Sequence, residues 1–225
     1  MQYEIKQAPF AVLECNLNAG EGMKCQMGGM SWMSRNIQMQ TKVGGMKGLL
    51  KKAVTGEAIA LNHYLCEGEN GSISFAMSFP GQILALDVSE NTLIAQKQSF
   101  MAAEESVVVD IAIQEKLGGG LFGGEGFIMQ KFSGQGMVFI EVYGGAVQKE
   151  LAPGEELVVD TGYVAAMDQT VKMNIERIKG AKNILLGGEG LFNTVLTGPG
   201  RVWLQTMPVS ALASALYPYM PQTSN

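Results

Sequence analysis

Histidine and cysteine are scarce in this chain of 225 residues, and their scarcity excludes several kinds of site. His63 is the single histidine, whereas metal sites of the cupin and facial-triad kinds need at least two. The three cysteines show no C-x-x-C spacing, so neither a zinc site nor a disulfide framework is indicated. We expect reduced, buried thiols at Cys15, Cys25 and Cys66, as in a cytoplasmic protein.

Charged side chains are also few, at 16% of the residues against a usual share of about 25%. The net charge of −5 argues against nucleic-acid binding, which depends on Lys and Arg that neutralise phosphates. The low charge indicates that part of the surface is covered, most simply by other copies of the chain. There is no secretory leader and no apolar run of about 20 residues, so we expect a cytoplasmic location.

Catalytic signatures are absent or lie in the wrong context. Residues 118–123 match G-x-G-x-x-G, but a dinucleotide site needs that loop between a strand and a helix. Residues 127–129 instead begin a strand. His63 lies in an alternating strand, where a surface or half-buried histidine is expected. We predict no catalytic residue, no cofactor and no bound metal.

An internal repeat is the main positive feature. Residues 124–128 are echoed by 188–192, and 132–140 by 196–204, while a weaker first copy covers 48–50 and 54–61. Glu125 and Glu189 hold equivalent positions and are interpreted as turn carboxylates, the alternative being a cation held on a shared axis. A Gly-containing turn element also recurs, at residues 19–23, 80–84 and 153–157.

The repeats predict an all-β fold with three tandem units around a pseudo-threefold axis. The units cover approximately residues 1–75, 76–148 and 149–206 of a single compact body, with a C-terminal tail at 207–225. Helix is expected only at 49–54 and 208–217. Strands are expected at 10–17, 30–33, 61–65, 84–88, 107–113, 127–129, 136–143, 157–160, 171–178 and 202–206.

Two segments are candidates for contact with other molecules. The first combines an apolar helical stripe with lysines and is either a lid packed on the protein or a contact with a partner or an anionic membrane; it consists of Met46, Lys47, Leu49, Leu50, Lys51 and Lys52. The second belongs to a charge-free stretch, 202–225, and is a candidate contact within a cyclic homo-oligomer; its residues are Trp203, Leu212, Leu216, Tyr217 and Tyr219. The alternative is that this tail closes one end of its own β core.

Four segments together resemble a widespread family whose eukaryotic branch is named for altered inheritance of mitochondria: 44–57, 79–81, 151–162 and 197–206. The resemblance covers nearly the whole chain. It implies a fold similar to the tryptophan RNA-binding attenuation protein, of the double-stranded β-helix or β-sandwich kind. It carries over no catalytic residues and fits a prokaryotic, cytoplasmic member.

Two classes of function follow from these observations. The first is a non-catalytic scaffold or interaction protein, which associates with itself and with a protein partner or a membrane surface. The alternative is a small-molecule-binding β module, and an enzyme of unknown type is the second alternative.

Overall fold

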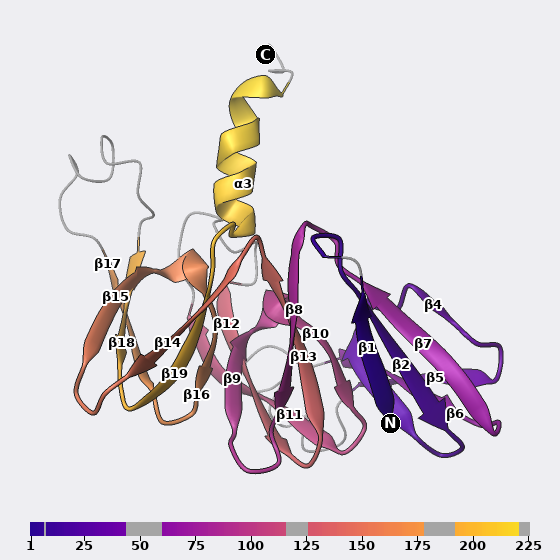
Figure 1. The fold of residues 1–225 in the computed structure, drawn as a ribbon. Helices are drawn as coiled ribbons and strands as arrows, with labels where there is room; N and C mark the ends of the chain where they lie inside the picture. The colour runs from indigo at the N-terminus through magenta and orange to yellow at the C-terminus, as the bar shows by residue number, and fades with distance from the viewer. Residues whose placement is uncertain (7, 44–59, 116–125, 178–191, 221–225) are drawn as a thin grey trace.

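The structure, a computed structural model, describes residues 1–6, 8–43, 60–115, 126–177 and 192–220. Within these ranges the chain is all-β, with four antiparallel sheets, three short 3₁₀ turns and one α-helix (Figure 1). The all-β class predicted from the sequence is therefore confirmed. The helix predicted at 49–54 lies outside the described residues.

The first sheet has four strands and contains the N-terminus. Its order is β1 (Gln2–Lys6), β2 (Val12–Asn18), β7 (Asn70–Ala76) and β4 (Trp32–Met33). The second sheet has six strands, in the order β5 (Ile37–Val43), β6 (Ala60–Cys66), β3 (Gly22–Gln26), β10 (Phe100–Glu104), β13 (Met137–Tyr143) and β8 (Gly81–Asp87).

The third sheet also has six strands. Its order is β11 (Val107–Glu115), β12 (Phe127–Gly134), β9 (Leu93–Gln96), β16 (Val164–Asp168), β19 (Gly200–Gln205) and β14 (Ala146–Leu151). The fourth sheet contains β15 (Glu156–Asp160), β18 (Phe192–Thr197) and β17 (Lys172–Arg177). The 3₁₀ turns are η1 (Lys97–Ser99), η2 (Thr161–Tyr163) and η3 (Tyr217–Tyr219), and the helix is α3 (Val209–Leu216).

Two runs of six consecutive strands pair in the same way. In the second block, β8–β13, the paired orders are β8-β13-β10 and β11-β12-β9. In the third block, β14–β19, they are β14-β19-β16 and β17-β18-β15. Strand β9 of the second block pairs with β16 of the third block. The three strands β11-β12-β9 and the three strands β16-β19-β14 therefore form one six-stranded sheet that joins the two blocks.

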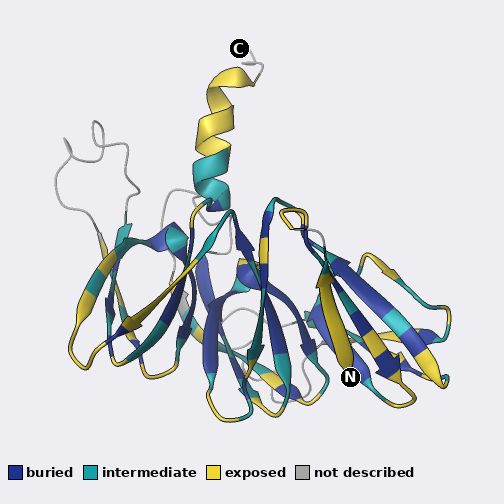
Figure 2. Ribbon diagram, viewed as in Figure 1, coloured by how far each residue is buried: buried dark blue, intermediate teal, exposed yellow. Residues whose placement is uncertain are grey.

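A strand that separates two clusters of buried side chains is apolar on both faces. In β13, Val138, Ile140 and Val142 point into one cluster of buried side chains, while Phe139 and Tyr143 point into another. Burying a side chain of this size stabilises the fold by roughly 1.5–3 kcal/mol. Figure 2 shows the same division, with buried residues concentrated in the inner strands and exposed residues in the outer ones.

The strands expected from clustered β-branched residues are confirmed. Residues 107–113 belong to β11, while β13 and β17 lie within the predicted ranges 136–143 and 171–178. The helix expected at 208–217 is α3, which has Pro208 as its N-cap residue. It ends at Leu216, and a 3₁₀ turn that contains Pro218 follows.

One turn element was equated wrongly. Gly20 and Gly154 both have positive φ and lie in turns after β2 and β14. The sequence pattern equates residues 80–84 with these turns, but Gly81 is the first residue of β8 and so begins the first strand of its block, whereas Gly20 and Gly154 follow the first strands of theirs. Gly81 is needed for close approach, because a Cβ there would overlap the Val142 carbonyl oxygen.

The weaker first copy of the repeat also differs from the prediction. Most of 48–50 and 54–61 lies outside the described residues, apart from Ala60 and Leu61 at the start of β6. The strands whose pairing corresponds to β12 and β13 are instead β6 and β7. The repeated Glu125 and Glu189 are outside the described residues too.

Candidate functional site

Two carboxylates on equivalent strands bind backbone N–H groups at the starts of the strands beside them. The Glu104 Oε2 atom on β10 accepts a hydrogen bond of 2.7 Å from the backbone N–H of Met137. The Asp168 Oδ2 atom on β16 accepts one of 2.9 Å from the backbone N–H of Arg201. Both acids therefore have a structural role, since each side-chain oxygen satisfies a backbone donor beside a strand turn.

Arg201 links this contact to an aromatic ring. Its Nε and Nη2 atoms donate to the two carboxylate oxygens of Asp168, at 2.9 and 3.0 Å. This hydrogen bonding raises the pKa of Arg201. The guanidinium carbon lies 5.0 Å from the ring centre of Trp203, whose indole N–H donates to Gln148 at 3.1 Å.

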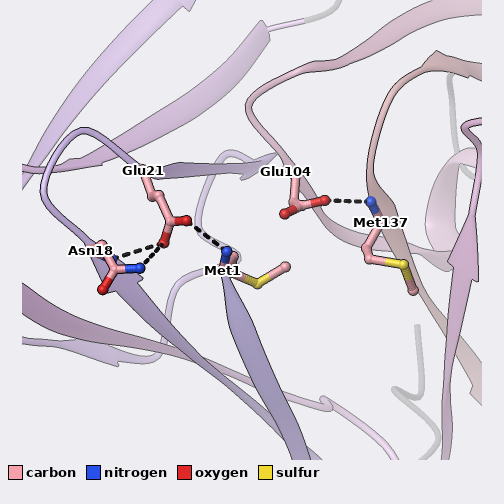
Figure 3. A network of polar contacts seen from close by, with 5 residues as sticks. All are labelled: Met1, Asn18, Glu21, Glu104 and Met137. Atoms are coloured by element: carbon pink, nitrogen blue, oxygen red, sulfur yellow. Dashed lines mark hydrogen bonds and ion pairs between the residues drawn. The ribbon is translucent and has the colours of Figure 1, made fainter.

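A second charged cluster surrounds the amino group of Met1 (Figure 3). That ammonium donates to Glu21 Oε1 at 2.7 Å, and the other oxygen of Glu21 accepts from the backbone and side-chain nitrogens of Asn18, at 2.8 and 3.2 Å. Hydrogen bonding to the ammonium lowers the pKa of Glu21 and raises that of the Met1 amino group. The carboxylate is thus satisfied by groups of its own chain.

His63 forms a pair with Glu105. Its Nδ1 atom lies 2.7 Å from both carboxylate oxygens, and its side chain is only 15% exposed. The sequence-based expectation of a surface or half-buried, satisfied histidine on a strand is confirmed, because His63 lies on β6.

Among the acidic side chains that the structure describes, Glu141 has the largest pKa shift, and the sequence analysis did not identify it. It lies on β13 between Phe139 and Tyr143, on the face of the strand that both these aromatic residues share. Desolvation raises the pKa of Glu141 to about 7, although a hydrogen bond with Tyr143 acts in the opposite direction. The pKa of Tyr143 is raised by burial and by the neighbouring carboxylate. A carboxyl of this kind holds a proton near neutral pH.

The cysteines are buried and free, as expected. Burial raises the pKa of Cys15 to about 12 and that of Cys25 to about 11, so both stay as unreactive thiols. Among the described residues, no group of three or more His, Cys, Asp or Glu side chains is placed to hold a metal ion.

The residues of the predicted oligomer contact differ in exposure: one is buried and the others lie on a projecting helix and the turn after it. Trp203 is only 3% exposed and belongs to a buried cluster, so its surface is covered by its own chain. The remainder lie on α3 and η3, where exposure increases toward the end of the chain: Leu212 is half-buried, Leu216 is 49% exposed, Tyr217 63% and Tyr219 87%.

Helix α3 stands away from the sheets (Figure 1). Its base is held by the backbone N–H of Met207, which donates to the Tyr143 carbonyl at 3.1 Å, and by the half-buried Val209. None of its own residues is buried. From Val202 to Asn225 the sequence contains no charged residue, so the projecting helix carries only apolar and small side chains.

The other predicted contact falls outside the described residues. It consists of Met46, Lys47, Leu49, Leu50, Lys51 and Lys52. Among the residues that the structure covers, no helix has the length and apolar character needed to span a bilayer.

The strands and their pairing define an all-β protein, in which Glu104 and Asp168 bind backbone groups of neighbouring strands. The family model described as "Mitochondrial biogenesis AIM24" matches residues 3–207, and the chain belongs to that family. This match confirms the resemblance noted in the sequence.

Two relatives come from Streptococcus pyogenes. An uncharacterized protein of serotype M6 is 27% identical over 226 residues, which cover 96% of this chain and 89% of that protein. The crystal structure of a second S. pyogenes protein superposes with a TM-score of 0.81, covers 97% of this chain and 99% of that chain, and is 24% identical. The likeness to this crystal structure shows the fold alone.

Proposed function

We propose that this protein is a non-catalytic scaffold that associates with copies of itself through α3 and η3. The observation that carries the proposal is the exposed, charge-free helix. Leu216, Tyr217 and Tyr219 are 49%, 63% and 87% exposed. Apolar and aromatic groups that project together in this way are typical of contact surfaces, where Tyr is enriched.

The architecture that we propose is three tandem units similar to the attenuation protein, joined side by side along the chain. The second and third blocks have the same pairing order, and β2-β7-β4 with β5-β6-β3 repeats it in a first block, β2–β7. This order supports units that begin near β2, β8 and β14 and pack into one body.

The non-catalytic part of the proposal is supported by the structural roles of the described titratable groups. His63 is paired with Glu105, and Glu104 and Asp168 bind backbone N–H groups at strand starts. Free, buried cysteines are consistent with a reducing compartment and support a cytoplasmic location.

Sedimentation velocity at micromolar concentration tests the association through α3. We expect the full chain to sediment as a species heavier than its 24.1 kDa monomer. Leu216→Asp and Tyr219→Asp should each shift the distribution to smaller species, because a charge in the contact must be desolvated. Val108→Asp is the matched control, since Val108 is 52% exposed on β11, away from α3.

The proposal fails if the full chain is monomeric throughout this range. It also fails if the α3 variants sediment like the wild type and the Val108 control.

A further inference from the structure

The blocks are joined by one kind of strand pairing, which occurs twice. In the first junction, β3 of the first block pairs antiparallel with β10 of the second. In the second junction, β9 of the second block pairs antiparallel with β16 of the third. Each junction therefore joins the second strand of one block to the third strand of the next, and each extends two half-sheets into a six-stranded sheet.

Two strands of the same kinds have no such neighbour among the described residues. β15 is the second strand of the third block and pairs only with β18, while β4 is the third strand of the first block and pairs only with β7. Figure 1 shows β15 and β4 at opposite sides of the molecule. The third block thus has one open strand edge, on β15, and the first block has the complementary open edge, on β4.

Burial shows what the open edges lack. All four residues of β9 are buried, whereas no residue of β15 is buried. At matching positions, Ile94 is 8% exposed and Val158 is 62% exposed. Trp32 on β4 is 52% exposed, whereas Ala102 and Ala166 at the corresponding positions are fully buried.

The register of a missing junction follows from the spacing of the strands. Gln96 and Asp160 each end a strand just before a 3₁₀ turn, so Val159 corresponds to Ala95 and Val158 to Ile94. Ala166 follows Asp160 by six residues, as Trp32 follows Gln26. In the β9–β16 junction, Ala95 lies opposite Ala166 and Ile94 opposite Met167.

We propose that β15 of one copy pairs antiparallel with β4 of a second copy, with Val159 opposite Trp32 and Val158 opposite Met33. This contact is separate from the association through α3, because it involves neither α3 nor η3. The occupant of the open edge is a second copy of this chain, since β4 is the one described strand with an open edge of the kind that β3 and β9 already pair with.

Side-chain chemistry fits this pairing. In the β9–β16 junction, Ile94 and Met167 both belong to the third buried cluster, so the incoming strand helps to close the core of the next block. Met33 packs against the first cluster. Val158 would take the place of Ile94 beside Met33 and close the first block of the second copy. The same strand pairing would cover the exposed indole ring of Trp32 on the edge strand β4.

The proposed interface is heterologous, because it joins two different edges. Repetition of a heterologous contact gives a closed ring when the rotation closes and a filament when it does not. Open edges of this kind are usually protected in natural sheets, and pairing with another copy is one way to protect them.

Disulfide trapping tests the pairing. A Val158→Cys chain is mixed with a Met33→Cys chain and treated with diamide, which oxidises dithiols to disulfides. Directly opposed residues on antiparallel strands have Cβ atoms about 4.5–5.5 Å apart, within reach of a disulfide after small adjustment. We expect a covalent dimer of twice the 24.1 kDa chain mass that disappears on reduction. The native cysteines do not interfere, because all three are buried.

Val147→Cys replaces Val158→Cys in the control. Val147 is 42% exposed on the edge strand β14, which takes no part in the proposed contact. We expect at least ten-fold less dimer with this control. The second pair, Trp32→Cys with Val159→Cys, repeats the test in case Met33→Cys fails to fold.

Two results would overturn the proposal. One is a dimer yield from both pairs no greater than from the control. The other is a Val158→Cys chain that cross-links only to itself, since that result indicates a symmetric β15–β15 contact. Neither result depends on α3, so the association through α3 can fail or hold separately.

Discussion

Asp168 accepts three hydrogen bonds from Arg201: one from the backbone N–H at 2.9 Å, one from Nε at 2.9 Å and one from Nη2 at 3.0 Å. A single carboxylate thus binds both the backbone and the side chain of one residue on the neighbouring strand β19. Ser34 has the corresponding role in the first block, where its Oγ atom accepts the backbone N–H of Ser72 at 2.9 Å. The contact is maintained although the acceptor changes from carboxylate to hydroxyl.

The first prediction concerns this acceptor. Asp168→Ala should lower the free energy of unfolding by about 1–3 kcal/mol, because it leaves the Arg201 donors without their charged acceptor. Asp168→Asn should cost less, since the amide oxygen can still accept the backbone N–H. Urea denaturation of the three proteins measures both differences. Equal stability of Asp168→Ala and wild type would contradict the structural role.

The second prediction concerns close packing at the start of β8. Gly81→Ala should destabilise the protein by about 1–3 kcal/mol, because the added Cβ meets the Val142 carbonyl and the Tyr143 Cα at 3.0 Å, so the backbone must move. Gly145→Ala is the matched control, since the atoms nearest to its added Cβ would be side-chain atoms of Thr206 at 3.5 and 3.6 Å. Thermal melts of both variants give the comparison, and similar losses in the two would refute it.

The third prediction is a pH dependence of stability. The pKa of Glu141 is raised to about 7 in the folded protein, from a usual value near 4.5, so the folded state binds its proton more tightly than the unfolded state. Its contribution to stability is complete below about pH 4.5 and is lost as the pH rises through 7. The loss at pH 8 should be at most about 3 kcal/mol.

Glu141→Gln removes this titration and supplies the control. The variant should gain stability over wild type at pH 8 and differ little at pH 4.5, as measured by urea denaturation at both values. A stability difference that is the same at the two pH values would show that Glu141 does not titrate in this range.

The fourth prediction is taken from the sequence alone and concerns residues 46–52. If this segment contacts an anionic membrane, the wild type should float with vesicles that contain anionic lipid, and Leu49→Glu and Leu50→Glu should reduce flotation. Three lysines would each contribute about 1 kcal/mol at such a surface. Flotation that is equal in all three proteins, or absent from all, would favour a lid packed on the protein.

Individual strands could be recognised from the sequence, but their partners could not. The β-branched residues of 107–113 correctly indicated β11, because a pleated, half-buried surface favours them. The consecutive strands β12 and β13, however, belong to different sheets and do not pair with each other. Period-two alternation shows that a strand has two faces, and it carries no information on which strand lies beside it.

The same limit explains the site residues. Trp203 and Leu216 both belong to a charge-free stretch, yet one is 3% and the other 49% exposed. Composition places both residues in an apolar segment. Trp203 is buried because β19 lies inside the third sheet, between β16 and β14, and the sequence alone does not reveal that position. Glu141 was missed because a lone Glu in an apolar strand looks like an outward-facing residue. The signal that could have identified it is the aromatic residues at i±2, Phe139 and Tyr143, which share its face of the strand.

The sheets that cross from one block to the next also affect how the chain gains its structure. The 67 residues from Lys97 to Tyr163 lie between β9 and β16 in the sequence, and yet the two strands are neighbours in one sheet. Removing the third block would uncover β9, all of whose residues are buried. Each block therefore needs its neighbour to bury its strands, and the blocks should unfold together in one transition. Because most contacts join residues that are far apart in the sequence, we expect folding to be slow.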